Sequence, residues 1–149
     1  MNQNTTLYDT DLHAWALDQA QALRAGHVEA LDLEHLAEEL ESMGASERAE
    51  LTSRMTELLL HLLKWRFQPE RHGASWEVSI IKQRNGIADL LETSPSLRPR
   101  LLEVLAKAWP RALRLAVAET RLPLASFPED CPFTLEEVLA AEFWPEAER

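Results

Sequence analysis

The sequence is poor in cysteine and glycine, and each shortage excludes a class of protein. Cys131 has no second cysteine to pair with, which excludes a disulfide framework and a zinc site made of paired cysteines. The four glycines form no phosphate-binding loop. No apolar run approaches the roughly 20 residues that a membrane-spanning helix needs. The first residues lack the charged and then apolar layout of a signal peptide, so we expect a cytoplasmic protein.

Positive charge is also scarce, because 25 acidic residues outnumber 15 basic ones and the net charge is −10. The imbalance is uneven: residues 1–63 hold twelve acidic and three basic side chains, whereas residues 64–84 hold two and five. A negative field over most of the molecule disfavours non-specific attraction to nucleic acid or to anionic lipid. We therefore expect no membrane partner, and we rank nucleic acid below a protein or a small anionic ligand.

What the chain does contain is helical periodicity along most of its length. At 149 residues with 46% hydrophobic composition, it is long enough for one domain with a real core. No alternating β-branched pattern of useful length is present. We predict an all-α, single-domain, compact bundle of about five to six helices. The expected helices span about residues 9–24, 33–43, 47–67, 76–92, 97–121 and 135–143.

Capping residues and helix breakers set these predicted boundaries. Gly44 is expected to end the second helix, and Ser46 to begin the third. Ser75 and Ser96 are expected to begin the fourth and fifth helices in the same way. Pro110 lies inside the fifth helix and is expected to kink or split it.

We expect the third predicted helix to be central, with Leu58 and Leu62 buried. Two amides interrupt the apolar faces of other predicted helices. Gln19 lies on the apolar side of the first helix, and Gln83 lies in the middle of the apolar face of the fourth. A buried amide must be hydrogen-bonded, because leaving it unsatisfied costs about 1–3 kcal/mol. These amides either fix the register of the helices or line a polar pocket.

Basic, aromatic and amide side chains gather around the predicted end of the third helix and the start of the fourth. Cations placed among aromatic rings and amides bind an anion or a planar ligand, but they also join two helices across a turn. In the second interpretation they are a brace that pairs with the acidic residues of the first two helices. The candidate binding residues, called the basic-aromatic corner below, are Lys64, Trp65, Gln68, Arg71, Trp76, Gln83 and Arg84.

Carboxylates gather on the second predicted helix, where Glu34, Glu38 and Glu41 share one face beside His35. Carboxylate and imidazole groups at helical spacing are typical of metal sites. A di-metal bundle needs a Glu-x-x-His pair on each of two helices, and the sequence contains none. We therefore interpret the carboxylates as a solvated acidic face and expect neither a metal nor a cofactor.

The fifth predicted helix carries a second group of cations within one arc. Such a stripe is most often a solvated face, and it is otherwise a contact surface for an acidic partner or a nucleic-acid backbone. Cys131 precedes the last helix, where a thiolate is favoured, but no histidine is placed near it and we expect no reactive role. The stripe consists of Arg100, Lys107, Arg111, Arg114 and Arg121.

Several blocks of residues, taken in order and at their spacing, resemble a known family. The blocks are Tyr8-Asp9-x-Asp11 with Trp15 and Gln19, Leu23-Arg24-x-Gly26, Glu38-Glu39-Leu-Glu41-Ser42-Met-Gly44, His61-Leu-Leu-Lys64-Trp65-x-x-Gln68-Pro69, Ser75-Trp76 with Gln83-Arg84, Cys131-Pro132-Phe133-Thr134, and Phe143-Trp144-Pro145. On these blocks, over almost the full length, the chain resembles the bacterial family of domains of unknown function numbered twenty-nine. The resemblance implies a small, single-domain helical protein, and it implies no activity.

These patterns favour a non-enzymatic binding or regulatory module whose contact site is the basic-aromatic corner. No complete set of acid, base and nucleophile, or of metal ligands, can be assembled from the sequence. The first alternative is an enzyme for an anionic substrate, with His61 as the acid or base and the cations of the corner holding the charge. The second alternative is a nucleic-acid-associated protein that uses the stripe on the fifth helix.

Overall fold

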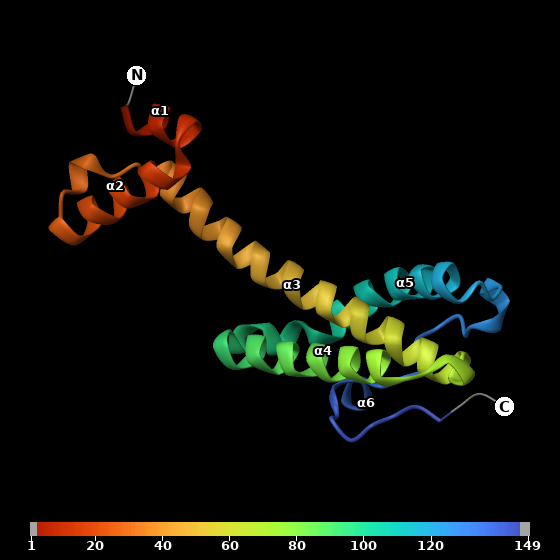
Figure 1. The fold of residues 1–149 in the computed structure, drawn as a ribbon. Coiled ribbons are helices and arrows are strands. Elements are labelled where there is room, and N and C mark those ends of the chain that lie inside the picture. Colours follow the sequence, from red (N-terminus) through yellow and green to blue (C-terminus); the bar gives the residue numbers. More distant parts are fainter. Residues whose placement is uncertain (1–2, 147–149) are drawn as a thin grey trace. The chain divides into compact units, whose positions relative to one another are not determined.

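The structure is a computed structural model that describes residues 3–146 of the chain. Within that range six α-helices and four short 3₁₀ segments follow one another, without a strand among them (Figure 1). The all-α prediction is therefore confirmed. The chain divides into two compact units, Met1–Ser46 and Glu47–Arg149. None of the described helices combines the length and the apolar character that crossing a membrane requires.

The first unit consists of α1 (Gln3–Thr10), α2 (Leu12–Ala25), the 3₁₀ segment η1 (Val28–Ala30) and the beginning of α3 (Leu33–Phe67). Asp11 separates α1 from α2, because its carboxylate accepts a hydrogen bond of 3.0 Å from the backbone N–H of Ala14. Gly26 ends α2 in the left-handed conformation, with φ 73°. The predicted helix over residues 9–24 therefore ends correctly but begins too early.

The predicted break between the second and third helices is wrong. Residues 33–43 and 47–67 belong to one continuous helix, α3, and Gly44 lies inside it. A glycine commonly ends a helix where the chain turns into the left-handed region, and among the described residues only Gly26 and Arg121 have a positive φ. Inside a helix, glycine costs only about 1 kcal/mol relative to alanine, and the alanine, glutamate and arginine residues around it favour helix.

The second unit is built from the rest of α3 together with α4 (Ala74–Thr93), α5 (Leu101–Thr120) and α6 (Leu135–Leu139). Their connections contain the 3₁₀ segments η2 (Pro69–Arg71), η3 (Pro95–Arg100) and η4 (Leu124–Ser126). Figure 1 shows the last turns of α3 lying between α4 and α5. Leu58 and Leu62 of α3 are both 0% exposed, as predicted, and Ile80 of α4 and Ala112 of α5 belong to the same buried cluster. The core of this unit therefore lies along α3.

All three predicted serine caps are wrong, and Ser46 lies inside α3. Ser75 lies inside α4, which begins at Ala74 after Gly73 without a side-chain cap. Ser96 lies inside η3, and α5 begins at Leu101 rather than near residue 97. The prolines of η3 suit a tight 3₁₀ turn, because proline cannot donate the backbone hydrogen bond that an α-helix would need there.

The end of the chain shows where proline and capping rules succeed and fail. α5 runs through Pro110 to Thr120 as one helix, so the expected split does not occur. Thr134 and Glu137 form the reciprocal capping box that their spacing favours, and α6 follows them. α6 ends at Leu139, earlier than the predicted end at residue 143.

Candidate functional site

Lys64 is held within the fold by an acid and an aromatic ring from two other helices. Its Nζ lies 2.9 Å from Oε2 of Glu119 on α5 and 4.6 Å from the ring centroid of Trp76 on α4. The lysine side chain is only 12% exposed, so both contacts are partly shielded from water. Lys64 therefore links α3 to α4 and α5, and its charge already has a partner.

Trp65 lies in an aromatic stack that the C-terminal segment closes. The imidazole of His72 stacks on it with ring centroids 4.4 Å apart, and the ring of Trp144 lies 4.7 Å away at 41°. The same Trp144 ring lies 5.7 Å from the guanidinium carbon of Arg84. Trp144, which follows α6, therefore covers two members of the basic-aromatic corner.

Arg84 is buried, with 6% of its surface exposed, and it joins α4 to α6. Its Nε donates to the carbonyl oxygen of Val138 at 2.9 Å, and its Nη2 donates to that of Glu137 at 3.3 Å. Nη1 is the buried side-chain polar atom that lacks a hydrogen-bond partner among the described residues. Burial lowers the pKa of Arg84, and the negative charge of Glu142 opposes that shift. Arg84 is thus a brace, but its partners are main-chain carbonyls rather than carboxylates.

The side chains of the remaining members of the corner have different partners. Gln68 is buried, and its Nε2 donates to the carbonyl oxygen of Thr120 at 3.4 Å. Gln83 accepts a hydrogen bond of 3.2 Å from Nη1 of Arg54, so this amide belongs to the contact between α3 and α4. Arg71 is exposed, and its side chain has no hydrogen bond or ion pair within the part of the chain that the structure describes. The seven residues therefore do not share one set of side-chain contacts.

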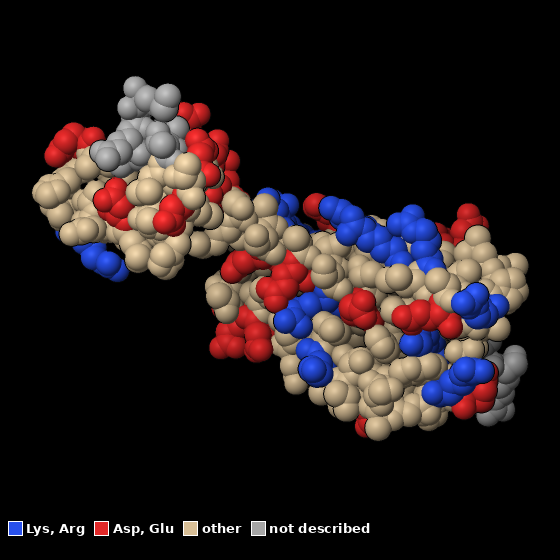
Figure 2. Space-filling view, turned by 45° about the horizontal axis from the view of Figure 1, so that its top comes forward, with Lys and Arg blue, Asp and Glu red and all other residues tan. Residues whose placement is uncertain are grey.

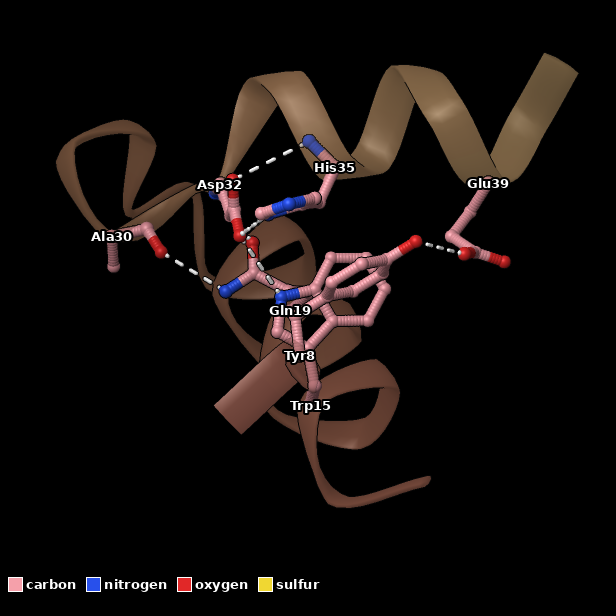
Figure 3. A network of polar contacts seen from close by, with 7 residues as sticks. All are labelled: Tyr8, Trp15, Gln19, Ala30, Asp32, His35 and Glu39. Carbon is pink, nitrogen blue, oxygen red and sulfur yellow. Dashed lines mark hydrogen bonds and ion pairs between the residues drawn. The ribbon is translucent and has the colours of Figure 1, made fainter. Parts of the chain in front are cut away.

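A second polar cluster lies in the first unit, where Asp32 is the shared acceptor (Figure 3). Its Oδ2 accepts a hydrogen bond of 3.2 Å from Nε1 of Trp15 and lies 2.7 Å from Nδ1 of His35. Gln19 accepts from the backbone N–H of Asp32 at 2.7 Å and donates to the carbonyl oxygen of Ala30 at 3.2 Å. The Asp32 network, as it is named below, comprises Tyr8, Trp15, Gln19, Asp32, His35 and Glu39.

Tyr8 joins the Asp32 network through both its ring and its hydroxyl. The ring stacks on the imidazole of His35, with centroids 3.9 Å apart and planes at 17°. The hydroxyl donates a hydrogen bond of 2.7 Å to Oε1 of Glu39. That hydrogen bond, together with burial and the neighbouring acids, raises the pKa of Tyr8 to about 12. Tyr8 therefore remains a hydrogen-bond donor at any physiological pH.

Asp32 and His35 shift each other's pKa in opposite directions. Burial by itself raises the pKa of Asp32, but the hydrogen bonds from His35 and Trp15 outweigh it, and the pKa lies below its ordinary value. The hydrogen bond to Asp32 raises the pKa of His35 against the opposing effect of burial. The two groups therefore keep their opposite charges over a wider pH range than separate groups would.

The carboxylates beside the Asp32 network are solvated. Glu34, Glu38 and Glu41 are all exposed, whereas His35 is half-buried and belongs to the network. No group of three His, Cys, Asp or Glu side chains within residues 3–146 is placed to hold a metal ion. The aspartate–histidine pair is the kind that orients a general base in enzymes. Here the imidazole of His35 stacks on Tyr8, and the hydrogen bond from Trp15 to Asp32 joins α2 to the start of α3.

A groove of about 360 Å³ lies between α3 and α5 of the second unit. Its lining residues are Ser53, Thr56, Glu57, Arg111, Arg114 and Leu115. Arg111 and Arg114 are exposed, and their side chains form no ion pair or hydrogen bond with any described residue. The hydroxyl of Thr56 donates to the carbonyl oxygen of Thr52 at 2.8 Å, so its oxygen is left as an acceptor. This surface is named the Arg111–Arg114 groove.

The two arginines of the groove belong to the predicted basic stripe. Figure 2 shows cationic side chains gathered in a band on the side of the larger unit where α5 lies. Lys107 and Arg121 of the stripe are exposed as well. Arg100 lies in η3 rather than in α5, with Nη1 4.0 Å from Oε1 of Glu103. The stripe thus contributes two cations to a groove and leaves the others on open surface.

The two remaining candidate reactive groups are tied to the main chain. Nδ1 of His61 lies 2.8 Å from the carbonyl oxygen of Glu57, and the histidine side chain is 14% exposed. Sγ of Cys131 contacts the carbonyl oxygen of Phe133 at 3.5 Å. Burial raises the pKa of this thiol, so the expectation that a helix N-terminus favours its thiolate is wrong.

Sequence reasoning missed the partners that complete each cluster. Asp32 is in none of the candidate sets drawn from the sequence, although Trp15 and Gln19, which hydrogen-bond with it, belong to one of the resemblance blocks. Trp144 stands in another such block, which was the available signal for its place over Trp65. No local signal identifies Glu119 as the partner of Lys64, because the two lie 55 positions apart.

The helices and these sites define an all-helical protein with an acidic, polar-centred N-terminal unit and a larger unit that presents free cations. The chain belongs to the family described as domain of unknown function DUF29, whose model matches residues 7–144. The resemblance found in the sequence is therefore confirmed. No curated protein and no solved structure was found to match the chain.

Proposed function

We propose that the protein is a non-enzymatic binding module whose contact site for an anionic group is the Arg111–Arg114 groove. The observation that carries the proposal is that both arginines are exposed and lack a partner among the described residues. In the basic-aromatic corner, by contrast, Lys64 is paired with Glu119 and Arg84 donates to two carbonyls. A guanidinium without an internal partner binds a ligand without breaking a contact of the fold.

The lining of the groove restricts the chemistry of its ligand. Arg111 and Arg114 lie one turn apart on α5, and a guanidinium matches a phosphate or carboxylate with two parallel hydrogen bonds. Glu57 also lines the groove and is 47% exposed, so it repels a bare anion but accepts hydrogen bonds from hydroxyl or amino groups. The ligand class that satisfies both is a phosphate ester that carries hydroxyl or amino donors.

Binding is favoured over catalysis by the groups that line the groove. Ser53 and Thr56 supply hydroxyls, but among the described lining residues there is neither an imidazole nor a thiol. The candidate bases are Glu57 of the lining, whose side chain is 47% exposed, and His61, which does not line the groove and whose Nδ1 is held by the main chain. Hydrolysis or transfer of the bound phosphate ester would support the enzyme hypothesis. We expect the ester to bind and to remain unchanged.

Nucleic acid is the second candidate, and the distribution of charge favours it more than the net charge does. The second unit holds sixteen acidic and fourteen basic residues, a net charge of −2, so most of the −10 belongs to the first unit. Lys107 and Arg121 would extend the contact beyond the groove along the phosphate backbone. We expect this candidate to be the weaker one, because Glu57 opposes a continuous row of phosphates.

Calorimetric titration of the whole chain with ribose 5-phosphate tests the proposal, with a single-stranded 12-mer as the second ligand. We expect the sugar phosphate to bind, and the double variant Arg111→Gln/Arg114→Gln to lose that binding. Arg98→Gln is the control, because Arg98 is exposed and unpaired within the described residues but lies outside the groove. Equal losses in the variant and the control, or no binding of either ligand, would contradict the proposal. Preferred binding of the 12-mer with a steep salt dependence would select nucleic acid.

The family resemblance and the lone, half-buried Cys131 also support a bacterial and cytoplasmic setting for this module. Reducing conditions keep a single thiol free, and no disulfide is needed to hold the leucine-rich core. We therefore expect the binding experiment to give the same result with and without a reducing agent.

A further inference from the structure

Large apolar side chains are unusually exposed in the first unit. Seven of the twelve exposed large hydrophobic residues among the described ones lie within Met1–Ser46, which is less than a third of the chain. They are Leu12, Leu17, Leu23, Val28, Leu33, Leu40 and Met43. Single exposed leucines are ordinary, but a group of them on so small a unit indicates a contact surface.

Part of this group forms a regular stripe on α3. Its members, named the Leu40 stripe, are Leu33, Leu36, Leu40 and Met43. Spacings of three, four and three residues place these side chains on one face of the helix, as in the seam of a coiled coil. Leu33 and Leu40 are each 66% exposed and Met43 is 65% exposed, while Leu36 is half-buried. Ala37 and Gly44 border the stripe, and their small size lets a second helix approach closely.

Acidic side chains follow further round α3, beyond Ala37 and Gly44. Glu34 and Glu41 each lie about 100° round the helix from a leucine of the stripe, Glu38 lies nearly opposite the stripe, and all three are exposed. The first unit as a whole holds nine acidic residues and one basic residue, a net charge of −8. In Figure 2 its visible face shows acidic side chains around an uncharged surface. The exposed apolar stripe thus lies on a strongly acidic unit, and Glu34 and Glu41 are the nearest of these three carboxylates.

We propose that this face of α3 binds a cationic amphipathic helix of a partner protein. The apolar side of the partner would cover the Leu40 stripe, and long lysine or arginine side chains at its edge would reach toward Glu34 and Glu41. From Leu33 to Met43 the stripe is about 15 Å long, so it accommodates about three turns of a partner helix. The site is separate from the Arg111–Arg114 groove and does not depend on the function proposed for it.

Charge selects this partner over a second copy of the chain. Pairing two first units would bring a charge of −8 against a charge of −8, which opposes association. A cationic helix gains from the same field, because opposite charges both steer the encounter and stabilise the complex. The same field would repel an acidic amphipathic helix with an identical apolar face.

A synthetic peptide of three heptads, with leucine at the a and d positions and lysine at the exposed ones, serves as the probe. Its fluorescence anisotropy is followed as the whole chain is added, beside a scrambled peptide of the same composition. We expect the heptad peptide to bind, and the double variant Leu40→Gln/Met43→Gln to weaken it by about tenfold or more. Leu102→Gln is the control, because Leu102 is 69% exposed but lies on α5; it should bind like the parent chain.

A charge-matched pair of triple variants tests the three carboxylates. Replacing Glu34, Glu38 and Glu41 with Gln should weaken binding and flatten its salt dependence. The same change at Glu70, Glu77 and Glu92, which are exposed in the second unit, should have a smaller effect. All replaced side chains are exposed or lie on open helix faces, and circular dichroism would verify that each variant stays helical.

Two outcomes overturn the proposal. The first is binding that the stripe variant leaves unchanged, or that the scrambled peptide matches. The second is sedimentation of the parent chain as a dimer that Leu40→Gln/Met43→Gln converts to a monomer, which would assign the face to a second copy. Failure of either kind leaves the Arg111–Arg114 groove untouched, because the two surfaces share no residue.

Discussion

In the first unit of the chain the centre is polar, and in the second unit it is apolar. Among the described residues, the first unit buries Trp15 and Ala22 together with the polar Gln19 and Asp32, whereas the second unit buries 21 apolar residues in one cluster. An apolar cluster is stabilised by the area it removes from water, so its stability is shared among many residues. A polar centre is stable only when every member has its partner, so a few residues decide it.

The surfaces of the two units differ in the same sense. The first unit carries −8 of the net charge and most of the exposed large apolar side chains, while the second unit, with a charge of −2, carries the free arginines of the groove. Small units have too little interior to bury all their apolar residues. The same shortage of interior therefore accounts for the polar centre and for the exposed Leu40 stripe.

The largest effect is expected in the apolar centre. Replacing Leu58 or Leu62 with Ala should lower the free energy of unfolding by about 2–5 kcal/mol, because each leaves a cavity where the side chain is 0% exposed. Urea denaturation followed by circular dichroism measures the loss. The matched control is Leu102→Ala, at 69% exposure, which should change stability by less than about 0.5 kcal/mol. Equal losses at all three positions would contradict the proposed core.

A smaller and more local effect is expected in the polar centre. Asp32→Ala removes the acceptor of the Trp15 indole N–H and of His35, and a stranded buried donor costs about 1–3 kcal/mol. Amide hydrogen exchange should therefore accelerate in α2 and leave α4 and α5 largely unchanged. Asp18→Ala is the control, since Asp18 is exposed on the same helix. Uniform acceleration across both units would show that their stabilities are not separate.

Arg84 tests whether a buried polar residue of the second unit, like those of the first, stabilises the fold through its hydrogen-bond partners. In Arg84→Met the carbonyls of Val138 and Glu137 lose their donors, while removal of a buried charge offsets part of the loss. We expect stability to fall by about 1–2 kcal/mol, measured as a lower melting temperature. Lys82→Met, at an exposed position of the same helix, should melt like the parent chain. An unchanged or raised melting temperature would instead favour Arg84 as a ligand-binding residue.

The smallest effect is a pH dependence confined to the first unit. The raised pKa of His35 adds stability that is fully present below its ordinary value of about 6.5 and is lost as the pH rises through the folded value. The lowered pKa of Asp32 adds stability that is present above about 4 and is lost as the pH falls through the folded value. The first unit should therefore be most stable between about pH 4 and pH 6.5.

Titration of the histidine ring signals by nuclear magnetic resonance measures this dependence. We expect the pKa of His35 to lie above the ordinary value of about 6.5 and to fall in Asp32→Asn, which keeps the shape of the side chain but removes its charge. A His35 signal that titrates at the same pH in both proteins would contradict the ion pair.

The local features of the fold were predictable because they depend on neighbouring residues. Apolar periodicity identified the helices and the buried face around Leu58. The capping box joins Thr134 and Glu137, which are only three positions apart. Local rules failed where two of them compete. Gly44 and Ser46 read as a stop and a start, yet α3 continues, since nothing there draws the chain into a left-handed turn.

By itself the sequence determined that this protein is helical, acidic and a member of its family, because composition, period and motif are properties of the chain. Only the tertiary structure decided which polar side chains have a hydrogen-bond or ion-pair partner. Lys64, a candidate ligand-binding residue, is paired with Glu119 in the fold, whereas Arg111 and Arg114 of the predicted stripe line a groove without a side-chain partner. The physical reason is that a charge is free or paired according to residues far away in the sequence, and only packing brings those residues within reach.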